Sequence, residues 1–141
     1  LFENKRLSKD CERQGSVLAQ KDPNWSTYAN KFFYSKKING CLISQIKEVG
    51  FEYSIRDFSQ IVVPNSTWGA NGPMPMPLFF CNSNTKYSVP ENVLSNPKDY
   101  YINQRNVVNG NYLYPYVWDT KNDFSKDDCL SMFEKMKTFL R

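Results

Sequence analysis

Three consecutive segments of the chain have strand character, namely Tyr28–Ser35, Cys41–Val49 and Phe51–Phe58. In the third, the apolar residues Phe51, Tyr53 and Ile55 alternate with the polar residues Glu52, Ser54 and Arg56. A period of two is typical of strands with one buried face and one face in water. Between the first two segments stand Asn39 and Gly40, which both tolerate the positive φ of a tight hairpin turn. The pattern predicts an antiparallel meander of three strands.

Helical periodicity is found near the start of the chain. In Asn4–Gln20, the residues Leu7, Cys11 and Leu18 lie at spacings of four and seven. This spacing places them on one side of an amphipathic helix.

A second helix is predicted near the end of the chain, over Ser125–Leu140. Its apolar residues recur at spacings of three and four, as on a helix face that packs against a sheet. Ser125 precedes Asp128 by three residues, which is a variant of the capping box. The apolar stripe comprises Cys129, Met132, Phe133, Met136 and either Phe139 or Leu140. The predicted fold class is therefore α+β, an antiparallel sheet with a helix at each terminus.

The stretch Pro64–Asn96 is irregular and rich in Pro, Gly and Asn, which favour loops and turns. One short helical turn is predicted at Val89–Leu94, with Pro90 at its first position. A loop of more than about twenty residues is uncommon in a compact domain. We therefore expect part of this stretch to be functional or to form an ordered excursion.

Within that stretch, Trp68, Met74 and Met76 are candidate residues for contact with a partner. Trp68 has no periodic apolar neighbours, and the prolines hold the methionines in an extended segment at low entropic cost. The alternative is that the methionines only cover one edge of the sheet.

Aromatic residues at every second position predict a further strand over Tyr112–Trp118. Asn109 and Gly110 suit a hairpin turn before it, and Pro115 restricts the strand to an edge or an irregular position. The aromatic stripe consists of Tyr112, Tyr114, Tyr116 and Trp118. We favour the interpretation that its rings fill the inward face of the sheet. The alternative is that they stack on sugars or anchor a partner protein.

With 141 residues, the chain is expected to form one globular domain over residues 1–141. The formal net charge of +4 is too small for a dedicated nucleic-acid-binding domain, so we expect no nucleic-acid partner. No apolar run approaches the roughly 18 residues of a membrane span, so no transmembrane segment is expected in this chain.

The composition disfavours most kinds of catalysis. Histidine is absent, which removes the most common general base and metal ligand near neutral pH. The cysteines form no CxxC pair, and no phosphate-binding loop, dinucleotide fingerprint or serine nucleophile motif is found. We accordingly predict no enzyme activity, no catalytic residue, no metal and no cofactor. The catalytic alternative is a pair of carboxylates among residues such as Glu52, Asp57 and Asp119, as glycosidases use.

Four well-separated cysteines, Cys11, Cys41, Cys81 and Cys129, are typical of two disulfides and of an oxidising compartment. Four cysteines allow three pairings. We therefore expect an exported protein, located in a periplasm, at a cell surface or in the medium.

Residues 34–42 read YSKKINGCL. This segment resembles a pattern in small exported bacterial proteins and lipoproteins of unassigned function. In those proteins a cysteine-bearing helix precedes a strand that reads approximately Y-[SN]-x-K-L-N-x-C, and Ile38 replaces the usual leucine here. The resemblance covers only the region around Cys11 and Cys41, names no activity, and implies export and a bridge between these two cysteines. The proximity of each helix to a neighbouring strand then selects Cys81–Cys129 as the second pair.

These observations predict an exported, disulfide-stabilised protein that works by binding a protein or carbohydrate partner. One alternative is a periplasmic inhibitor or immunity-type protein that blocks one enzyme, and another is a carboxylate-dependent hydrolase. Convergent acidic residues in an apolar groove would favour the hydrolase. A protruding aromatic surface would favour binding.

Overall fold

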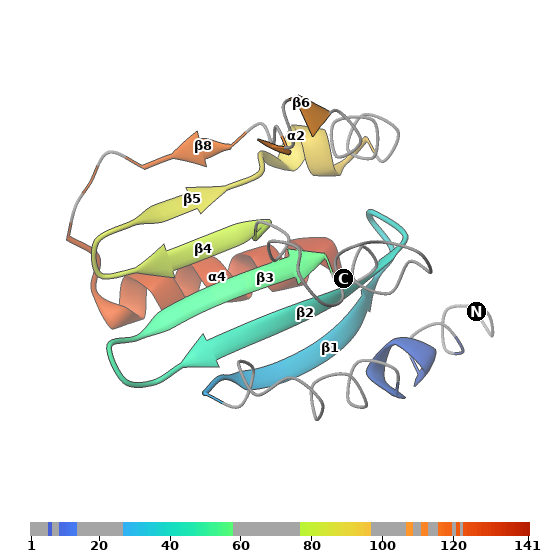
Figure 1. Cartoon of the computed structure of the whole chain (residues 1–141), viewed down its shortest axis with the longest axis horizontal. Coiled ribbons are helices and arrows are strands. Elements are labelled where there is room, and N and C mark those ends of the chain that lie inside the picture. The colour runs from blue at the N-terminus through green and yellow to red at the C-terminus, as the bar shows by residue number, and fades with distance from the viewer. Residues whose placement is uncertain are drawn as a thin grey trace.

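The protein is described by a computed structural model at residues 6, 9–13, 27–57, 77–96, 107–108, 111–112, 116–119, 121 and 123–141. Among these residues, one antiparallel sheet has the strand order β1-β2-β3-β4-β5-β8, and a long helix lies across one of its faces (Figure 1). The strands of this sheet are β1 (Ala29–Ser35), β2 (Gly40–Lys47), β3 (Glu52–Asp57), β4 (Phe79–Asn82), β5 (Lys86–Ser88) and β8 (Val117–Trp118). The other described elements are a two-stranded sheet, β6 (Val107–Val108) and β7 (Asn111–Tyr112), the helices α2 (Glu91–Leu94) and α4 (Lys126–Leu140), and the helical residues 6 and 9–13 near the N-terminus. The α+β class and the antiparallel sheet are as predicted.

The β1–β2 hairpin forms where the sequence predicts it, but its loop is longer than a two-residue turn. Asn39 has the expected positive φ of 52°, whereas Gly40 already belongs to β2 and pairs with Ser35. The reason is Ile38, whose side chain is fully buried in the core. A loop of four residues, 36–39, allows the Ile38 side chain to reach the core.

Helix α4 begins as predicted. The Ser125 hydroxyl accepts a hydrogen bond from the Asp128 amide at 3.0 Å, and the Asp128 carboxylate accepts one from the Ser125 amide at 3.4 Å. This reciprocal capping box satisfies two backbone donors that the first helical turn leaves free. The buried stripe of the helix consists of Cys129, Phe133, Met136 and Leu140. Met132, predicted to belong to it, is only partly buried.

Phe133 forms the centre of the contact between helix and sheet. Its ring centroid lies 5.4 Å from that of Tyr53 on β3 and 6.2 Å from that of Phe79 on β4. All three side chains are at most 2% exposed. Because Tyr53 and Phe79 face α4, strand alternation places Ser54 and Phe80 on the opposite face of the sheet.

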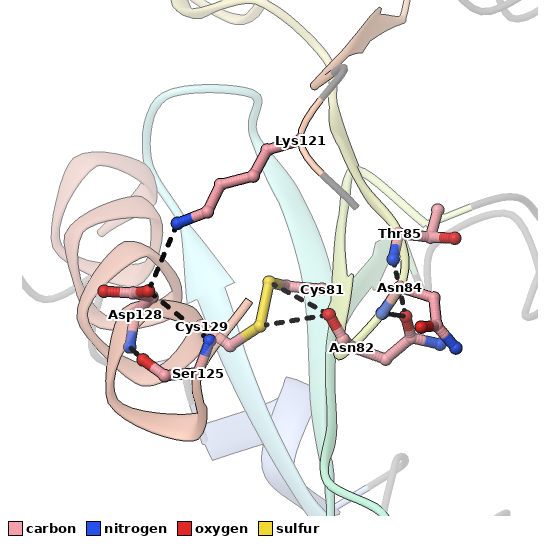
Figure 2. Close-up of a disulfide and its surroundings, with 8 residues drawn as sticks. All are labelled: Cys81, Asn82, Asn84, Thr85, Lys121, Ser125, Asp128 and Cys129. Carbon is pink, nitrogen blue, oxygen red and sulfur yellow. Dashed lines mark hydrogen bonds and ion pairs between the residues drawn. A yellow bond between two sulfur atoms is a disulfide. The ribbon is translucent and has the colours of Figure 1, made fainter. Parts of the chain in front are cut away.

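The two disulfides are the predicted pairs, Cys11–Cys41 and Cys81–Cys129. The second pair joins β4 to α4, with the Asn82 carbonyl oxygen 3.6 Å from the Cys129 sulfur (Figure 2). Cys41 neighbours Leu42, a core residue on the α4 side, and therefore points to the other face. Each disulfide consequently fastens a helical segment to a different face of the sheet, α4 to one and residues 9–13 to the other.

The predicted N-terminal helix, Asn4–Gln20, is confirmed where it is described, at residue 6 and over 9–13, and the remainder lies outside the described residues. The short helical turn is also present as α2, with Pro90 as its N-cap and not at its first helical position.

Two parts of the fold differ from the sequence-based expectation. The irregular stretch contains β4 and β5, whose four and three residues are too short to show a period. The turn between them is held by the Asn82 side chain, which accepts hydrogen bonds from the amides of Asn84 and Thr85 (Figure 2). The single strand predicted over Tyr112–Trp118 is wrong, since Tyr112 pairs with Val107 in the small sheet and Trp118 pairs with Tyr87 in the large one.

Candidate binding surface

Strand β8 lies at one end of the strand order and pairs only with β5 among the described strands. The Asp119 amide donates to the Lys86 carbonyl at 3.0 Å. In an antiparallel pair, backbone groups that point toward the partner strand alternate with groups that point away from it. The amide and carbonyl of Trp118 therefore point outward, at the edge of the sheet.

The two side chains of β8 are both exposed, although both are large and apolar. Val117 is 59% exposed and Trp118 is 56% exposed. They extend from opposite faces of the strand, because they are consecutive residues. Val117 is on the same face as Ser88 and α4, and Trp118 is on the same face as Tyr87. The edge thus presents an apolar side chain on each side of one exposed backbone unit.

Trp118 is the outermost member of an aromatic cluster on the face opposite α4. Its ring centroid lies 4.4 Å from that of Tyr87, which stacks on Phe80 at 5.2 Å. Tyr116 contacts Tyr87 edge-on at 4.9 Å, and its hydroxyl donates to the Pro77 carbonyl at 2.7 Å. Burial raises the pKa of the Tyr87 hydroxyl above its ordinary value. The inner rings are structural and hold Trp118 in place.

The preferred interpretation of the aromatic stripe, rings facing the core, is therefore wrong for Trp118. For Tyr116 the interpretation is correct in part, because the Tyr116 ring is partly buried and packs against the core cluster. The side chains of Tyr112 and Tyr114 lie outside the described residues. Exposure of Trp118 follows from its place on the last strand, where no further described strand covers it.

On the α4 face, a groove of about 320 Å³ lies between α4 and the strands β5 and β8. Helix α4 packs against β3 and β4, so the outer part of the sheet extends beyond it. The apolar part of the lining is formed by Phe79, Val89, Pro90, Val117, Met132 and Met136. The charged part is formed by Lys86 and Lys135, with Glu91 of α2. The groove is thus lined mainly by apolar side chains, with two positive charges and one negative charge among its lining residues.

A polar row crosses the face opposite α4. Gln45 on β2 is 2% exposed, and its amide donates to Asn30 on β1 at 3.0 Å. The Gln45 carbonyl oxygen accepts from Arg56 on β3 at 3.1 Å. Burial lowers the pKa of the Arg56 guanidinium, an effect that Tyr87, Tyr28 and Glu52 oppose electrostatically. Because the polar groups of this row form hydrogen bonds with one another, the row has a structural role and connects β1, β2 and β3.

The carboxylates named for a hydrolase are not assembled into a pair at β3. Glu52 and Asp57 are five positions apart on the same strand and therefore point to opposite faces. Glu52 accepts a hydrogen bond from the Tyr28 hydroxyl at 2.8 Å, on the face opposite α4. Burial and this hydrogen bond raise the pKa of the Tyr28 hydroxyl. The third acid, Asp119, accepts from the Lys121 amide in the turn after β8.

The candidate contact residues Trp68, Met74 and Met76 lie outside the described residues, so their role stays a prediction. The surface residues that sequence reasoning did not single out are Val117 on β8 and Lys86 and Lys135 around the groove. Pro115 was the available signal, because it restricts the following residues to an edge strand. Edge strands expose side chains that an inner strand would bury.

Comparisons with family models, with curated proteins and with solved structures find no match for this chain. In the described part of the chain, no helix is long and apolar enough to span a membrane. The same residues contain no cluster of three or more His, Cys, Asp or Glu side chains that could hold a metal ion.

Proposed function

We propose that this protein is an exported binding protein that contacts its partner through the edge of the sheet formed by β5 and β8. The observation that carries the proposal is the exposure of both β8 side chains, 59% for Val117 and 56% for Trp118. Isolated exposed apolar residues are ordinary on protein surfaces, but a Trp ring that packs on a buried ring, here Tyr87, is typical of an interaction anchor. A protruding aromatic surface is the feature that favours binding over hydrolysis.

Export is supported by the two disulfides. Disulfides persist in secreted, periplasmic and cell-surface proteins and are rare where thiols are kept reduced. Both bridges in this chain join helical segments to the sheet, so their loss in a reducing compartment would loosen both faces.

The contact surface is tested by replacing Val117 with a photo-crosslinking amino acid in the producing cells, which leaves the Trp118 ring in place. Residue Lys36 provides the control position, because it is exposed in the β1–β2 loop at the opposite end of the sheet. A covalent adduct of defined mass is expected from position 117 and not from position 36. Equal adducts from both positions, or none from 117, would contradict the proposal.

A further inference from the structure

We infer that the partner contributes an extended peptide in which acidic side chains stand two positions before and after an apolar one, and that this peptide adds to β8 as a further strand. The inference rests on the proposed function and names the class of partner. It is carried by three features that coincide at this edge: an outward-facing backbone unit, an adjoining apolar groove and the charge around that groove.

The backbone of β8 provides the first feature. The amide and carbonyl of Trp118 point away from β5, and no described hydrogen bond engages them. A strand placed about 4.8 Å from β8 would pair with these groups as β5 pairs on the other side. Main-chain pairing of this kind provides affinity in strand addition, while pockets for alternate side chains provide specificity.

The groove provides the second feature. An added strand would direct every second side chain toward the α4 face. These side chains would enter the groove that Val117 and Met132 line. The groove has a volume of about 320 Å³, which is enough for an apolar side chain of the added strand. Methionine side chains such as Met132 and Met136 adapt their shape to different apolar groups, as is common on peptide-binding surfaces. The side chains on the other face of the added strand would contact the exposed Trp118 ring.

Charge provides the third feature and selects an acidic peptide. Lys86 and Lys135 contribute two positive charges to the groove, against the single negative charge of Glu91. Neither lysine forms an ion pair in the described part of the chain, where the observed pairs involve other lysines. Acidic side chains that flank an apolar one, on the same face of the added strand, would reach these two ammonium groups.

The inference is tested by selecting random linear peptides from a phage-displayed library on the disulfide-intact protein. The selected peptides are expected to carry Asp or Glu two positions before or after an apolar residue, so that both reach the α4 face. Lys135→Glu should weaken their binding roughly fivefold or more, because it replaces a rim attraction by a repulsion. Lys36→Glu is the matched control, since it makes the same charge change at an exposed site far from the groove. Peptides without acidic residues, or equal effects of the two variants, would overturn the inference.

Strand addition is tested separately by methylating backbone amides of a selected peptide at alternate positions. One set of methylations should abolish binding and the other should leave it nearly unchanged, because only alternate amides face β8. Equal effects of both sets would overturn the proposed strand pairing.

Failure of this inference can be distinguished from failure of the proposed function. If a partner adduct forms at position 117 but Lys135→Glu leaves that partner's affinity unchanged, the binding function stands and the acidic peptide is refuted. If the adduct at position 117 is a glycan, the edge binds sugar and the peptide is likewise refuted. If no adduct forms at position 117, the proposed function itself fails.

Discussion

Tyr53 of β3 and Phe133 of α4 pack with their ring centroids 5.4 Å apart and an interplanar angle of 47°. The two side chains are 2% and 0% exposed, respectively. A tilted arrangement of this kind is favourable for aromatic rings beyond the area that they bury. This pair therefore fixes the position of α4 on the sheet.

Truncation of this contact should strongly destabilise the protein. Phe133→Ala is expected to reduce the free energy of unfolding by about 3–5 kcal/mol, because it leaves a cavity between α4 and the sheet. Thr138→Ala, at an exposed position on the same helix, should have little effect. Urea unfolding of both variants measures the difference. A Phe133→Ala variant as stable as the parent would show that this helix face is not core.

The four cysteines should be oxidised in the isolated protein. A thiol titration of the unfolded, unreduced protein should detect no free thiol. Loss of the Cys81–Cys129 bridge, in a double Ala variant, should cost about 4 kcal/mol by the loop-entropy relation for a sequence separation of 48. Four titratable thiols in freshly isolated protein would contradict both the pairing and the case for export.

Trp118→Ala should separate binding from stability. The ring is 56% exposed, so its removal should shift the melting temperature by no more than a few degrees. The same variant should lose most of its affinity for the partner identified by crosslinking. Val49→Ala is a suitable control, because Val49 is 84% exposed at the β2–β3 turn, away from β8. Unchanged affinity in Trp118→Ala would exclude the β8 edge as the contact surface.

The capping box should make part of the stability depend on pH. Hydrogen bonds from Ser125, together with the Lys121 ammonium, lower the pKa of the Asp128 carboxyl (Figure 2). The carboxylate therefore stabilises the folded state above the ordinary carboxyl pKa of about 4, and this contribution is lost as the pH falls through the lower folded value.

Asp128→Asn should consequently be less stable than the parent at neutral pH, and the difference should shrink in acid. Urea midpoints measured for both proteins at neutral pH and below about pH 3 test this directly. A difference that does not change with pH would indicate that the charge of Asp128 has no role in the cap.

The segment Pro64–Pro77 remains a second candidate contact region. Trp68→Ala is predicted to leave the melting temperature unchanged while reducing partner binding. Comparison with Trp118→Ala, in the same binding assay, shows which of the two tryptophans is the anchor. A large fall in melting temperature for Trp68→Ala would instead place its ring in the core.

The elements with a clear period were determined by the sequence alone. Helix α4 was predictable because Cys129, Phe133 and Met136 repeat at helical spacing after the Ser125 cap, which are local properties of the chain. The first three strands were predictable from their strand-forming residues. The disulfide pairing was predicted differently, from the resemblance around Cys11 and Cys41 and from the expected proximity of each helix to a neighbouring strand. Asn39 marked the first hairpin because few other residues tolerate a positive φ.

What the sequence could not determine was decided by distant parts of the chain. Strands β4 and β5 are too short for a period, and they form because β3 provides a partner strand for β4. Whether the side chains of β8 are buried depends on which strand β8 pairs with. Because it pairs with β5 at the end of the strand order, Val117 and Trp118 are exposed. An alternating aromatic pattern specified neither that Tyr112 and Trp118 belong to different sheets nor whether the face that carries Trp118 is covered. Burial depends on neighbours that come from elsewhere in the chain, so only the tertiary structure distinguished an edge from a core.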